Sequence, residues 1–183
     1  MATPKITTEA EALAAVKQHG DALQFVPENL KTAKVCLEAV KQEGTALIFV
    51  PNGIKTHEVC LAAVQNGYKL FNLPENLMSP EIFLAAVQKD GWTLQHVPEE
   101  MRTLELCLEA VRQDGNALQF VPDNLMTAEF CLEVVRQNSL MLLEVPENLR
   151  TAELCLEAIK RIIEIYVPEP LQAKVRAALK NAL

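Results

Sequence analysis

A proline that follows Val or Leu recurs along the chain, and its even spacing is the feature that most restricts the possible folds. Successive prolines of this kind are 24, 23, 24, 24, 24 and 22 residues apart. They are Pro27, Pro51, Pro74, Pro98, Pro122, Pro146 and Pro168. Self-similarity at one period of this length is typical of a solenoid or another repeat array. The sequence therefore predicts seven repeat units, the last of them eroded.

Each predicted unit begins at a Thr or a Ser. The first residues are Thr8, Thr32, Thr56, Ser79, Thr103, Thr127 and Thr151. A unit of this size cannot bury its own apolar face, whereas a stack of units shares one continuous core. The composition suits a shared core, because 50% of the 183 residues are hydrophobic and only 22% are charged. We therefore expect residues 1–183 to form a single solenoid domain.

The unit Thr103–Met126 shows how each repeat divides into a helix and a return segment. Thr103 is a favoured helix N-cap, and apolar side chains recur from Leu106 to Val111 with helical spacing. Pro122 excludes a second long helix, because its ring does not fit in a helix interior. The pattern predicts an all-α fold, a right-handed α-solenoid in which each unit has a main helix and a short helix or 3₁₀ turn.

A glycine marks the boundary between helix and return segment in five units. These glycines are Gly20, Gly44, Gly67, Gly91 and Gly115. Because glycine often ends a helix in the left-handed conformation, we expect left-handed caps at all five. Ser139 takes this place in the sixth unit, where we expect a distorted helix end. Beyond the boundary we expect a short helix or turn over Asn116–Val121 and a 3₁₀ turn over Pro122–Leu125.

The two ends of the array differ from the inner units. Glu11 stands where inner units carry apolar residues such as Val35, so we expect the first unit to act as an N-terminal cap. Residues 169–183 match no unit, and Pro170 favours the start of a final helix through Ala182. We expect this C-terminal cap to seal the last unit with one apolar side and to leave its basic side chains in water. The apolar side is Leu171, Val175, Ala178 and Leu179, and the basic side chains are Lys174, Arg176 and Lys180.

Five cysteines occupy one equivalent position of their units. They are Cys36, Cys60, Cys107, Cys131 and Cys155. The same position holds Ala12 and Phe83 in two other units, which indicates a buried apolar position. Neighbouring helices lie about 8–10 Å apart, farther than the Cα separation of about 7 Å that a disulfide can span. We predict buried free thiols, which fits a cytoplasmic location.

Several classes of function lack the residues that they need. The net charge of −7 argues against nucleic-acid binding, which requires clustered Lys and Arg. No apolar run reaches the ~18 residues of a membrane span, and the N-terminus lacks a secretion signal. His19, His57 and His96 fall at three different unit positions, and no zinc-type cysteine pair or phosphate-binding loop is present. We therefore expect no enzymatic activity, no metal or cofactor, and no nucleic-acid or membrane partner.

The units lose their similarity at two positions near the middle of the array. The residue after the boundary glycine is polar in the first two units but is Tyr68 and Trp92 in the next two, where we expect the rings side by side. A second position, aromatic in other units, becomes Asn72 and His96, and Phe71 stands beside Asn72. Aromatic side chains are favoured interface anchors, so these five residues form a candidate patch for a protein or peptide. The alternative is that Phe71 and Trp92 repack around the residue missing from the third unit.

The motifs LAAVKQHG at Leu13–Gly20, LEAVKQEG at Leu37–Gly44 and LEAVRQDG at Leu108–Gly115 are each followed by a Val-Pro ending. In these motifs the chain resembles a bacterial repeat family described only as a domain of unknown function. The resemblance covers Thr8 to about Leu171 and implies units of about 24 residues. It implies no activity and no catalytic or ligand-binding residue. The alternation of a helix with a shorter, tighter one is also similar to leucine-rich-repeat variant solenoids, although the motifs differ.

The sequence leaves three hypotheses for function. The first is a non-enzymatic protein-protein interaction or scaffold module that uses the extended surface of the array. The second is a small-molecule or carbohydrate site in a groove near Trp92, or an enzyme whose site the sequence does not reveal. The third is a purely structural or designed repeat without a partner. An open aromatic ledge would favour the first, a closed pocket the second, and a featureless surface the third.

Overall fold

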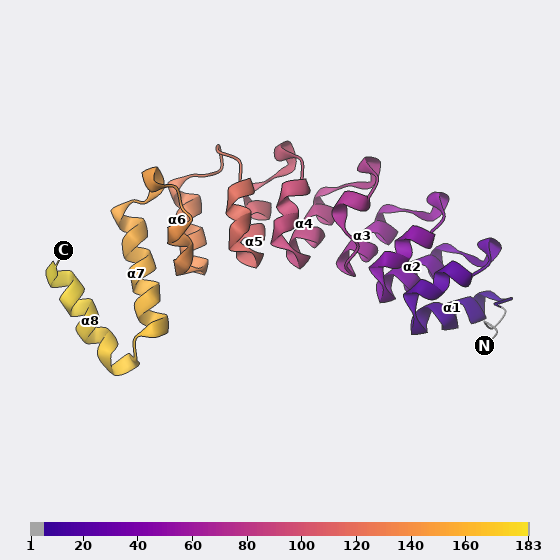
Figure 1. The fold of residues 1–183 in the computed structure, drawn as a ribbon, viewed down its shortest axis with the longest axis horizontal. Coiled ribbons are helices and arrows are strands. Elements are labelled where there is room, and N and C mark those ends of the chain that lie inside the picture. The colour runs from indigo at the N-terminus through magenta and orange to yellow at the C-terminus, as the bar shows by residue number, and fades with distance from the viewer. Residues whose placement is uncertain (1–5, 183) are drawn as a thin grey trace.

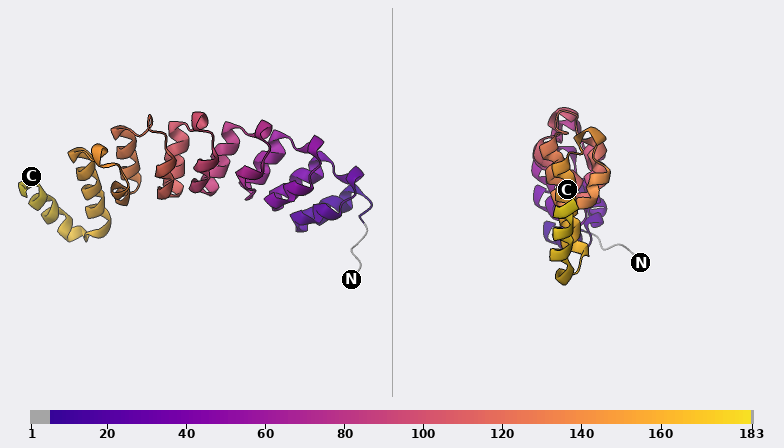
Figure 2. Two further views of the ribbon diagram at one scale, coloured as in Figure 1. Left: turned by 45° about the horizontal axis from the view of Figure 1, so that its top comes forward. Right: turned by 90° about the vertical axis from the view of Figure 1, so that its left-hand side faces the viewer.

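The computed structural model describes residues 6–182, and every regular element in this range is helical. The helices α1 to α7 stand side by side in chain order and form an arch (Figure 1). Two further views show that the arch is long and narrow (Figure 2). The all-α solenoid predicted from the sequence is confirmed for this range. Residues 1–5 and Leu183, which the predicted domain includes, lie outside the described residues.

In the described part of the chain, six repeats contain a main helix and a long 3₁₀ segment, which is only three residues long in the third repeat. Five of these six also contain a short 3₁₀ turn. The main helices are α1 (Glu9–Gln18), α2 (Ala33–Gln42), α3 (His57–Gln65), α4 (Pro80–Lys89), α5 (Leu104–Gln113), α6 (Ala128–Gln137) and α7 (Ala152–Tyr166), followed by α8 (Glu169–Ala182). The long 3₁₀ segments are η1 (Gly20–Phe25), η3 (Gly44–Phe49), η5 (Leu70–Asn72), η7 (Gly91–His96), η9 (Gly115–Phe120) and η10 (Ser139–Leu143). The short turns are η2 (Glu28–Leu30), η4 (Asn52–Ile54), η6 (Glu75–Leu77), η8 (Glu99–Met101) and η11 (Glu147–Leu149). Figure 1 places these short turns along the convex edge of the arch.

This return path agrees with the one expected from the prolines, with one difference. After Pro122 the chain forms a hydrogen-bonded turn over residues 123–125 instead of a 3₁₀ helix. The N–H groups of Leu125 and Met126 both donate to the Pro122 carbonyl, at 2.9 and 3.1 Å. The path of the chain is therefore the same in this unit as in the others.

A Thr or Ser starts each main helix because its hydroxyl accepts a hydrogen bond from the backbone N–H three residues later. Thr103 Oγ1 accepts from Leu106 at 3.3 Å, and Ser79 Oγ accepts from Ile82 at the same distance. The equivalent bond is present at the start of all seven main helices. Loss of such a cap typically costs about 1 kcal/mol. The predicted N-caps are confirmed.

The main helices and the return segments share one core. In a 3₁₀ helix, residues three apart lie on the same ridge, so the boundary glycine and the Leu three residues later both face inward. Gly91 with Leu94, and Gly44 with Leu47, are buried in this way. Burying a Leu side chain stabilises the fold by roughly 1.5–3 kcal/mol. The long 3₁₀ segments therefore pack into the same hydrophobic core as the main helices.

The cysteines line the helix side of this core. Cys36, Cys60, Cys107 and Cys131 are buried, and all five cysteines are free thiols, as predicted. Burial raises the pKa of the Cys36 and Cys107 thiols to about 11. Cys155 is only part-buried, because α8, and not another complete unit, follows α7.

The prediction of left-handed glycine caps is wrong for most units. Among the described glycines, Gly67 alone has a positive φ, of 93°. In the regular units an extended residue turns the chain instead, as Asp90 does at φ −157° and ψ 103°. Glycine follows for a different reason, because a Cβ on Gly91 would collide with the carbonyl oxygen of Ala110 in the next helix. Gly20 and Gly44 meet the next helix in the same way. These glycines allow adjacent units to stack closely.

The third unit is one residue shorter and turns by another route. The N–H of Gly67 donates to Val64 at 3.0 Å, and the N–H of Tyr68 donates to Ala63 at 2.9 Å. These are the two hydrogen bonds of a Schellman motif, which requires a left-handed residue. The left-handed glycine replaces the extended residue that this unit lacks.

The predicted distortion at Ser139 is also wrong. The C-cap of α6, Asn138, has φ −143° and ψ 105°, close to the −144° and 111° of Asp114, the C-cap of α5. Ser139 is buried and small enough to take the place of the glycine. The irregularity lies at the end of η10, where Glu144 adopts helical angles of −93° and −14°.

The N-terminal end is closed by polar groups, as predicted from Glu11. The Glu11 carboxylate accepts from the N–H groups of Thr7 and Thr8 at 2.8 and 3.1 Å. Thr8 Oγ1 accepts in turn from the Glu11 N–H at 3.2 Å, which completes a capping box. The hydrogen bond from the Thr7 backbone is the main reason that the pKa of Glu11 lies below its usual value.

The C-terminal cap covers less than predicted. Helix α7 continues to Tyr166, so the last unit has no 3₁₀ return segment, and the chain then reverses into α8. Leu171 is 48% exposed and Ala178 is exposed, while Val175 and Leu179 are only part-buried. Helix α8 packs back on α7, so only one side of α8 is covered. The expected seal of the last unit is therefore incomplete.

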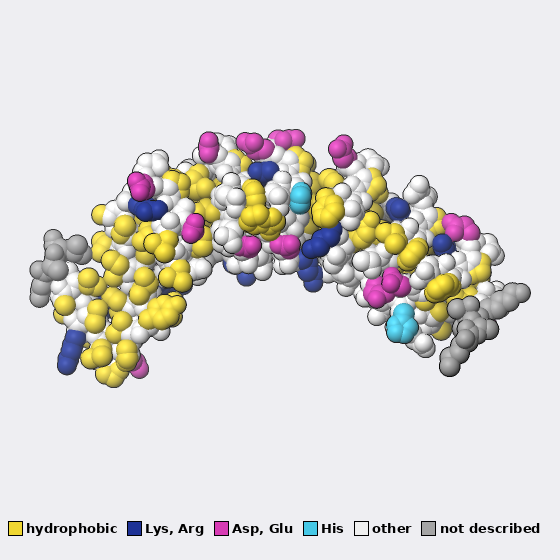
Figure 3. Space-filling model, viewed as in Figure 1, with side chains coloured by type: hydrophobic (Ala, Val, Ile, Leu, Met, Phe, Trp, Pro, Cys, Tyr) yellow, Lys and Arg dark blue, Asp and Glu magenta, His cyan; other side chains and the backbone are white. Residues whose placement is uncertain are grey.

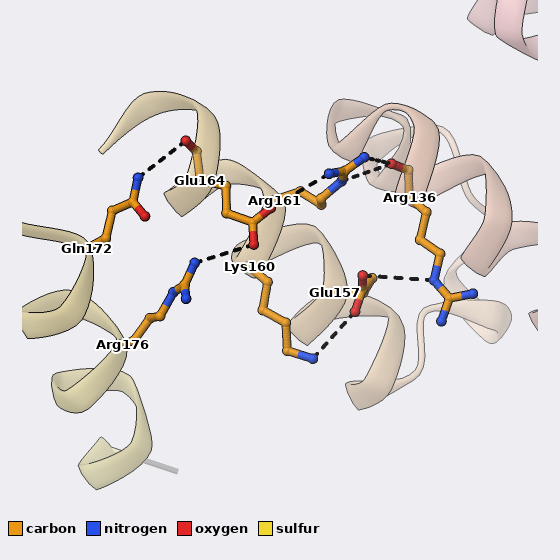
Figure 4. A network of polar contacts seen from close by, with 7 residues as sticks. All are labelled: Arg136, Glu157, Lys160, Arg161, Glu164, Gln172 and Arg176. Carbon is orange, nitrogen blue, oxygen red and sulfur yellow. Dashed lines mark hydrogen bonds and ion pairs between the residues drawn. The ribbon is translucent and has the colours of Figure 1, made fainter. Parts of the chain in front are cut away.

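Polar contacts attach α8 to α7 (Figure 4). Arg176 Nη2 lies 3.3 Å from Glu164 Oε1, whereas we expected Arg176 to be free in water. Gln172 Nε2 donates to the Glu164 carbonyl at 3.4 Å. Arg161 connects α7 to α6 by donating two hydrogen bonds to the Arg136 carbonyl, at 3.0 and 2.8 Å. These contacts order the end of the array without burying it.

Candidate functional site

The outer ridge of the long 3₁₀ segments carries exposed apolar side chains. The first and fourth residues after the boundary position lie three apart and therefore share this ridge. Some neighbouring segments contact each other, η1 with η3, η5 with η7 and η7 with η9, so the ridge is shared between the units that these segments join. We define the return face as the exposed apolar residues of this ridge and the ring residues at the fifth place after the boundary position, next to the ridge. The ridge residues are Ile48, Phe71, Trp92, Leu140 and Leu143, and the ring residues are exposed Phe25 and His96 with part-buried Phe49 and Phe120.

Two ring contacts join neighbouring units on the return face. The ring centroids of Phe71 and His96 are 5.5 Å apart, and those of Trp92 and Phe120 are 4.9 Å apart with an interplanar angle of 83°. The Trp92–Phe120 pair is edge-to-face, which is a favourable arrangement, and the Phe71–His96 pair is tilted at 56°. Phe71 nevertheless remains 61% exposed and Trp92 39% exposed. The contacts order these side chains and leave much of their surface open.

Tyr68 and Asn72 complete the set of predicted site residues. Tyr68 is part-buried against the core, and this burial raises the pKa of its phenol. Within residues 6–182 it makes no ring contact with Trp92, because the left-handed turn before Tyr68 sets it on a different backbone path. Asn72 is exposed at the end of η5. The structure thus brings Phe71 and His96 together and pairs Trp92 with a neighbour that the sequence did not suggest.

The three aliphatic residues of the return face were not predicted from the sequence. Ile48 and Leu143 are 60% and 71% exposed at a position where other units carry Gln, and Leu140 is 54% exposed at the position of Trp92. The three-residue period of a 3₁₀ helix would have assigned all of them to the outer ridge. The sequence alone does not determine the helical period of the return segment, so these three positions could not be assigned to an exposed ridge.

Basic side chains cross from one return segment to the next. Arg102 donates to the Val97 carbonyl at 2.9 Å and to the Phe120 carbonyl at 2.7 Å. Lys31 Nζ donates to the Phe49 carbonyl at 3.1 Å. These bonds satisfy backbone acceptors that the 3₁₀ segments leave free. They also hold cationic groups in fixed positions.

Two hollows of the surface lie away from the predicted patch. One of about 320 Å³ is lined by Leu84 and Met101, and one of about 350 Å³ is lined by Leu84 and Leu104. Trp92 lines neither of them. Trp92 therefore lies outside these two hollows, and 39% of its side chain is exposed.

One cluster contains the residue types of a catalytic triad but not its geometry. His57 Nε2 lies 2.8 Å from Ser79 Oγ and 3.6 Å from Glu81 Oε2. In a catalytic triad the acidic side chain accepts a hydrogen bond from Nδ1 of the histidine, and the serine hydroxyl lies at Nε2. Here both Ser79 and Glu81 lie at Nε2. Ser79 Oγ also accepts the N-cap bond of α4. We interpret this cluster as a polar contact between α3 and α4.

No three His, Cys, Asp or Glu side chains among residues 6–182 are grouped so that they could hold a metal ion. None of the helices described is both long and apolar enough to cross a membrane. The return face offers aromatic and aliphatic contact surface bordered by carboxylates.

The family comparison matches residues 12–55 and 79–126, just over half of the chain, to a family described as Domain of unknown function (DUF4116). The two matched segments lie in different parts of the array, so the matched domain is repeated within the chain. Comparisons with curated proteins and with solved structures found no match. The chain therefore belongs to the DUF4116 family of repeated domains of unknown function.

Proposed function

We propose that this protein is a non-enzymatic protein-interaction or scaffold module and that its return face contacts the partner. The observation that carries the proposal is the row of exposed apolar side chains that begins at Phe25 and ends at Leu143. Exposed apolar side chains that gather on one side of a protein are typical of interaction sites. Aromatic side chains such as Phe71 and Trp92 are favoured anchors at such sites.

Packing requirements alone do not account for this row. The inner ridge already buries its Leu residues, and the outer ridge is compatible with polar side chains such as Thr45 and Asn116. Ile48 and Leu143 stand at positions where Gln is equally well accommodated in other units. An apolar side chain at such a position gains little from burial within the chain. A partner that covers it would supply that burial.

Site-specific photo-crosslinking tests the proposal. A photoreactive phenylalanine analogue would replace Phe71, and a matched control would carry it at Leu104, which is 50% exposed on the helix side. After irradiation in an extract of the source cells, we expect a discrete crosslinked protein from position 71 and none from position 104. Mass spectrometry would identify the captured protein.

The capture should depend on the return face and not on the fold. Phe71→Ser should remove the partner from an affinity pull-down while the melting temperature stays unchanged, and Leu104→Ser should leave capture intact. A protein captured equally from both positions, or retained fully by Phe71→Ser, would contradict the proposal.

A further inference from the structure

The return segments carry most of the net charge of the chain. Residues 19–31, 43–55, 66–78, 90–102, 114–126 and 138–150 contain eleven acidic and five basic side chains, a net charge of −6. The whole chain has a net charge of −7. The main helices and the two ends are therefore almost neutral. Figure 3 shows Asp and Glu side chains along the convex edge, next to apolar side chains.

Three of the five basic side chains in these segments are bound to the backbone. Lys31, Arg102 and Arg150 donate to carbonyls of the long 3₁₀ segments. The acidic side chains that follow the prolines are exposed, and one of them, Glu28, pairs with Lys31 at 3.1 Å. They are Glu28, Glu75, Glu99, Asp123 and Glu147. Complementary charge steers a partner and selects it, so a partner with Lys or Arg beside its apolar residues fits this face.

The backbone of the return face is closed to strand pairing. The Phe49, Phe120 and Leu143 carbonyls already accept from Lys31, Arg102 and Arg150. Recognition by β-strand addition needs a row of free backbone donors and acceptors. A partner on this face must therefore satisfy its own backbone groups, as an α-helix does.

The spacing of the units also suits a helix. Neighbouring helices in packed arrays lie about 8–10 Å apart, so equivalent positions on successive units recur at about that distance. A helix rises about 1.5 Å per residue, and seven residues span about 10.5 Å. Apolar residues seven positions apart in a helix would therefore meet the apolar side chains of successive units.

We infer that the return face binds a basic amphipathic helix of a partner protein. Its apolar residues contact Phe71, Trp92 and Leu143, and its flanking Lys or Arg side chains lie near the carboxylates of the convex edge. This inference rests on the proposed function and adds the chemical class of the partner.

Two synthetic peptides of about three heptads test the inference. Both carry Leu at every seventh position and the same helix-favouring residues, but one has Lys and the other Glu at the flanking positions. Trp92, the one tryptophan of the chain, reports binding through its fluorescence. We expect the Lys peptide to bind at least about tenfold more tightly than the Glu peptide, and its affinity to fall as salt rises from about 0.05 to 0.3 M.

A pair of matched variants shows whether the charge acts locally. Glu99→Gln with Glu100→Gln removes two charges from the convex edge, and Glu105→Gln with Glu129→Gln removes two from the helix side. The first variant should bind the Lys peptide several-fold more weakly, and the second should bind it as the wild type does. Equal binding of the two peptides, or an equal loss in both variants, would overturn the inference.

The two proposals fail in different ways. If position 71 captures a protein that the Lys peptide does not displace, the partner is not a basic helix and the interaction role stands. If position 71 captures nothing that position 104 does not also capture, the return face is not the interaction surface and both proposals fail. Displacement of the captured protein by the Lys peptide and not by the Glu peptide would support both.

Discussion

The two long sides of this solenoid are built from the same repeats but present different surfaces. On the helix side, exposed arginines pair with part-buried glutamates, as Arg112 does with Glu109 and Arg136 with Glu133 and Glu157. The return face instead has exposed apolar side chains beside acidic groups, of which Glu28 and Asp90 pair with Lys31 and Lys69. The inner positions of both sides are buried in one core. Substitutions at buried inner positions should therefore lower stability on both sides of the solenoid. Substitutions at exposed outer positions should weaken partner binding only when they lie on the return face.

The largest expected effect tests the shared core. Gly91→Ala places a Cβ against the backbone of Ala110 and Asp114 in the next helix, while a Cβ on Gly53 would meet no neighbouring atom. We expect Gly91→Ala to lower the free energy of unfolding by about 2–4 kcal/mol and Gly53→Ala to change it by less than about 0.5 kcal/mol. Urea denaturation of both variants measures the difference. Equal stability would show that the return segments do not stack as closely as described.

A second test concerns burial on the helix side. Because the pKa of the Cys36 and Cys107 thiols is raised to about 11, these thiols stay protonated in the folded chain while they ionise in the unfolded chain. Their stabilising contribution is complete below pH 9 and is lost as the pH rises towards 11. We expect the urea midpoint to fall over this range, and to fall less steeply in a Cys36→Ala/Cys107→Ala variant. Ala12 occupies the same position in the first unit, so the substitution is compatible with the repeat.

A third test compares the contributions to stability of two arginines, one from each side of the solenoid. Arg102 is part-buried and donates to three carbonyls, whereas Arg112 is exposed and pairs at the surface with part-buried Glu109. Arg102→Ala leaves carbonyls without their donor and should lower the free energy of unfolding by about 1–2 kcal/mol. Arg112→Ala should change it little, because exposed ion pairs contribute little to stability. Thermal unfolding of both variants measures the two changes in stability. An equal loss of stability in both variants would contradict the distinction between the two sides.

The smallest expected effect on stability lies on the outer ridge. Phe71 is 61% exposed and contacts His96 through one ring pair. Phe71→Ala should therefore shift the melting temperature little, while Leu70→Ala, which truncates the buried neighbouring side chain, should lower it clearly. Calorimetry of the two adjacent variants separates an outer from an inner position within a single short helix.

The period, the N-caps and the buried cysteines could be predicted from the sequence because each depends on local chemistry that repeats in every unit. The role of the boundary glycines could not, because it depends on the distance between Gly91 and Ala110 of the next helix, which no local pattern contains. The candidate patch was predicted in part. Phe71 and Trp92 differ visibly from their counterparts, whereas Ile48 and Leu143 are recognised as exposed only once the 3₁₀ period is known.

The central claim is that a protein partner covers the return face, and Trp92 tests it most directly because it is the one tryptophan and lies on that face. Acrylamide quenching of its fluorescence would be measured for the free protein and for the complex with the protein captured at position 71. We predict that the quenching constant falls at least about twofold in the complex, because the partner shields the 39% of the side chain that is exposed. An unchanged quenching constant in a complex shown to be fully formed would contradict the account.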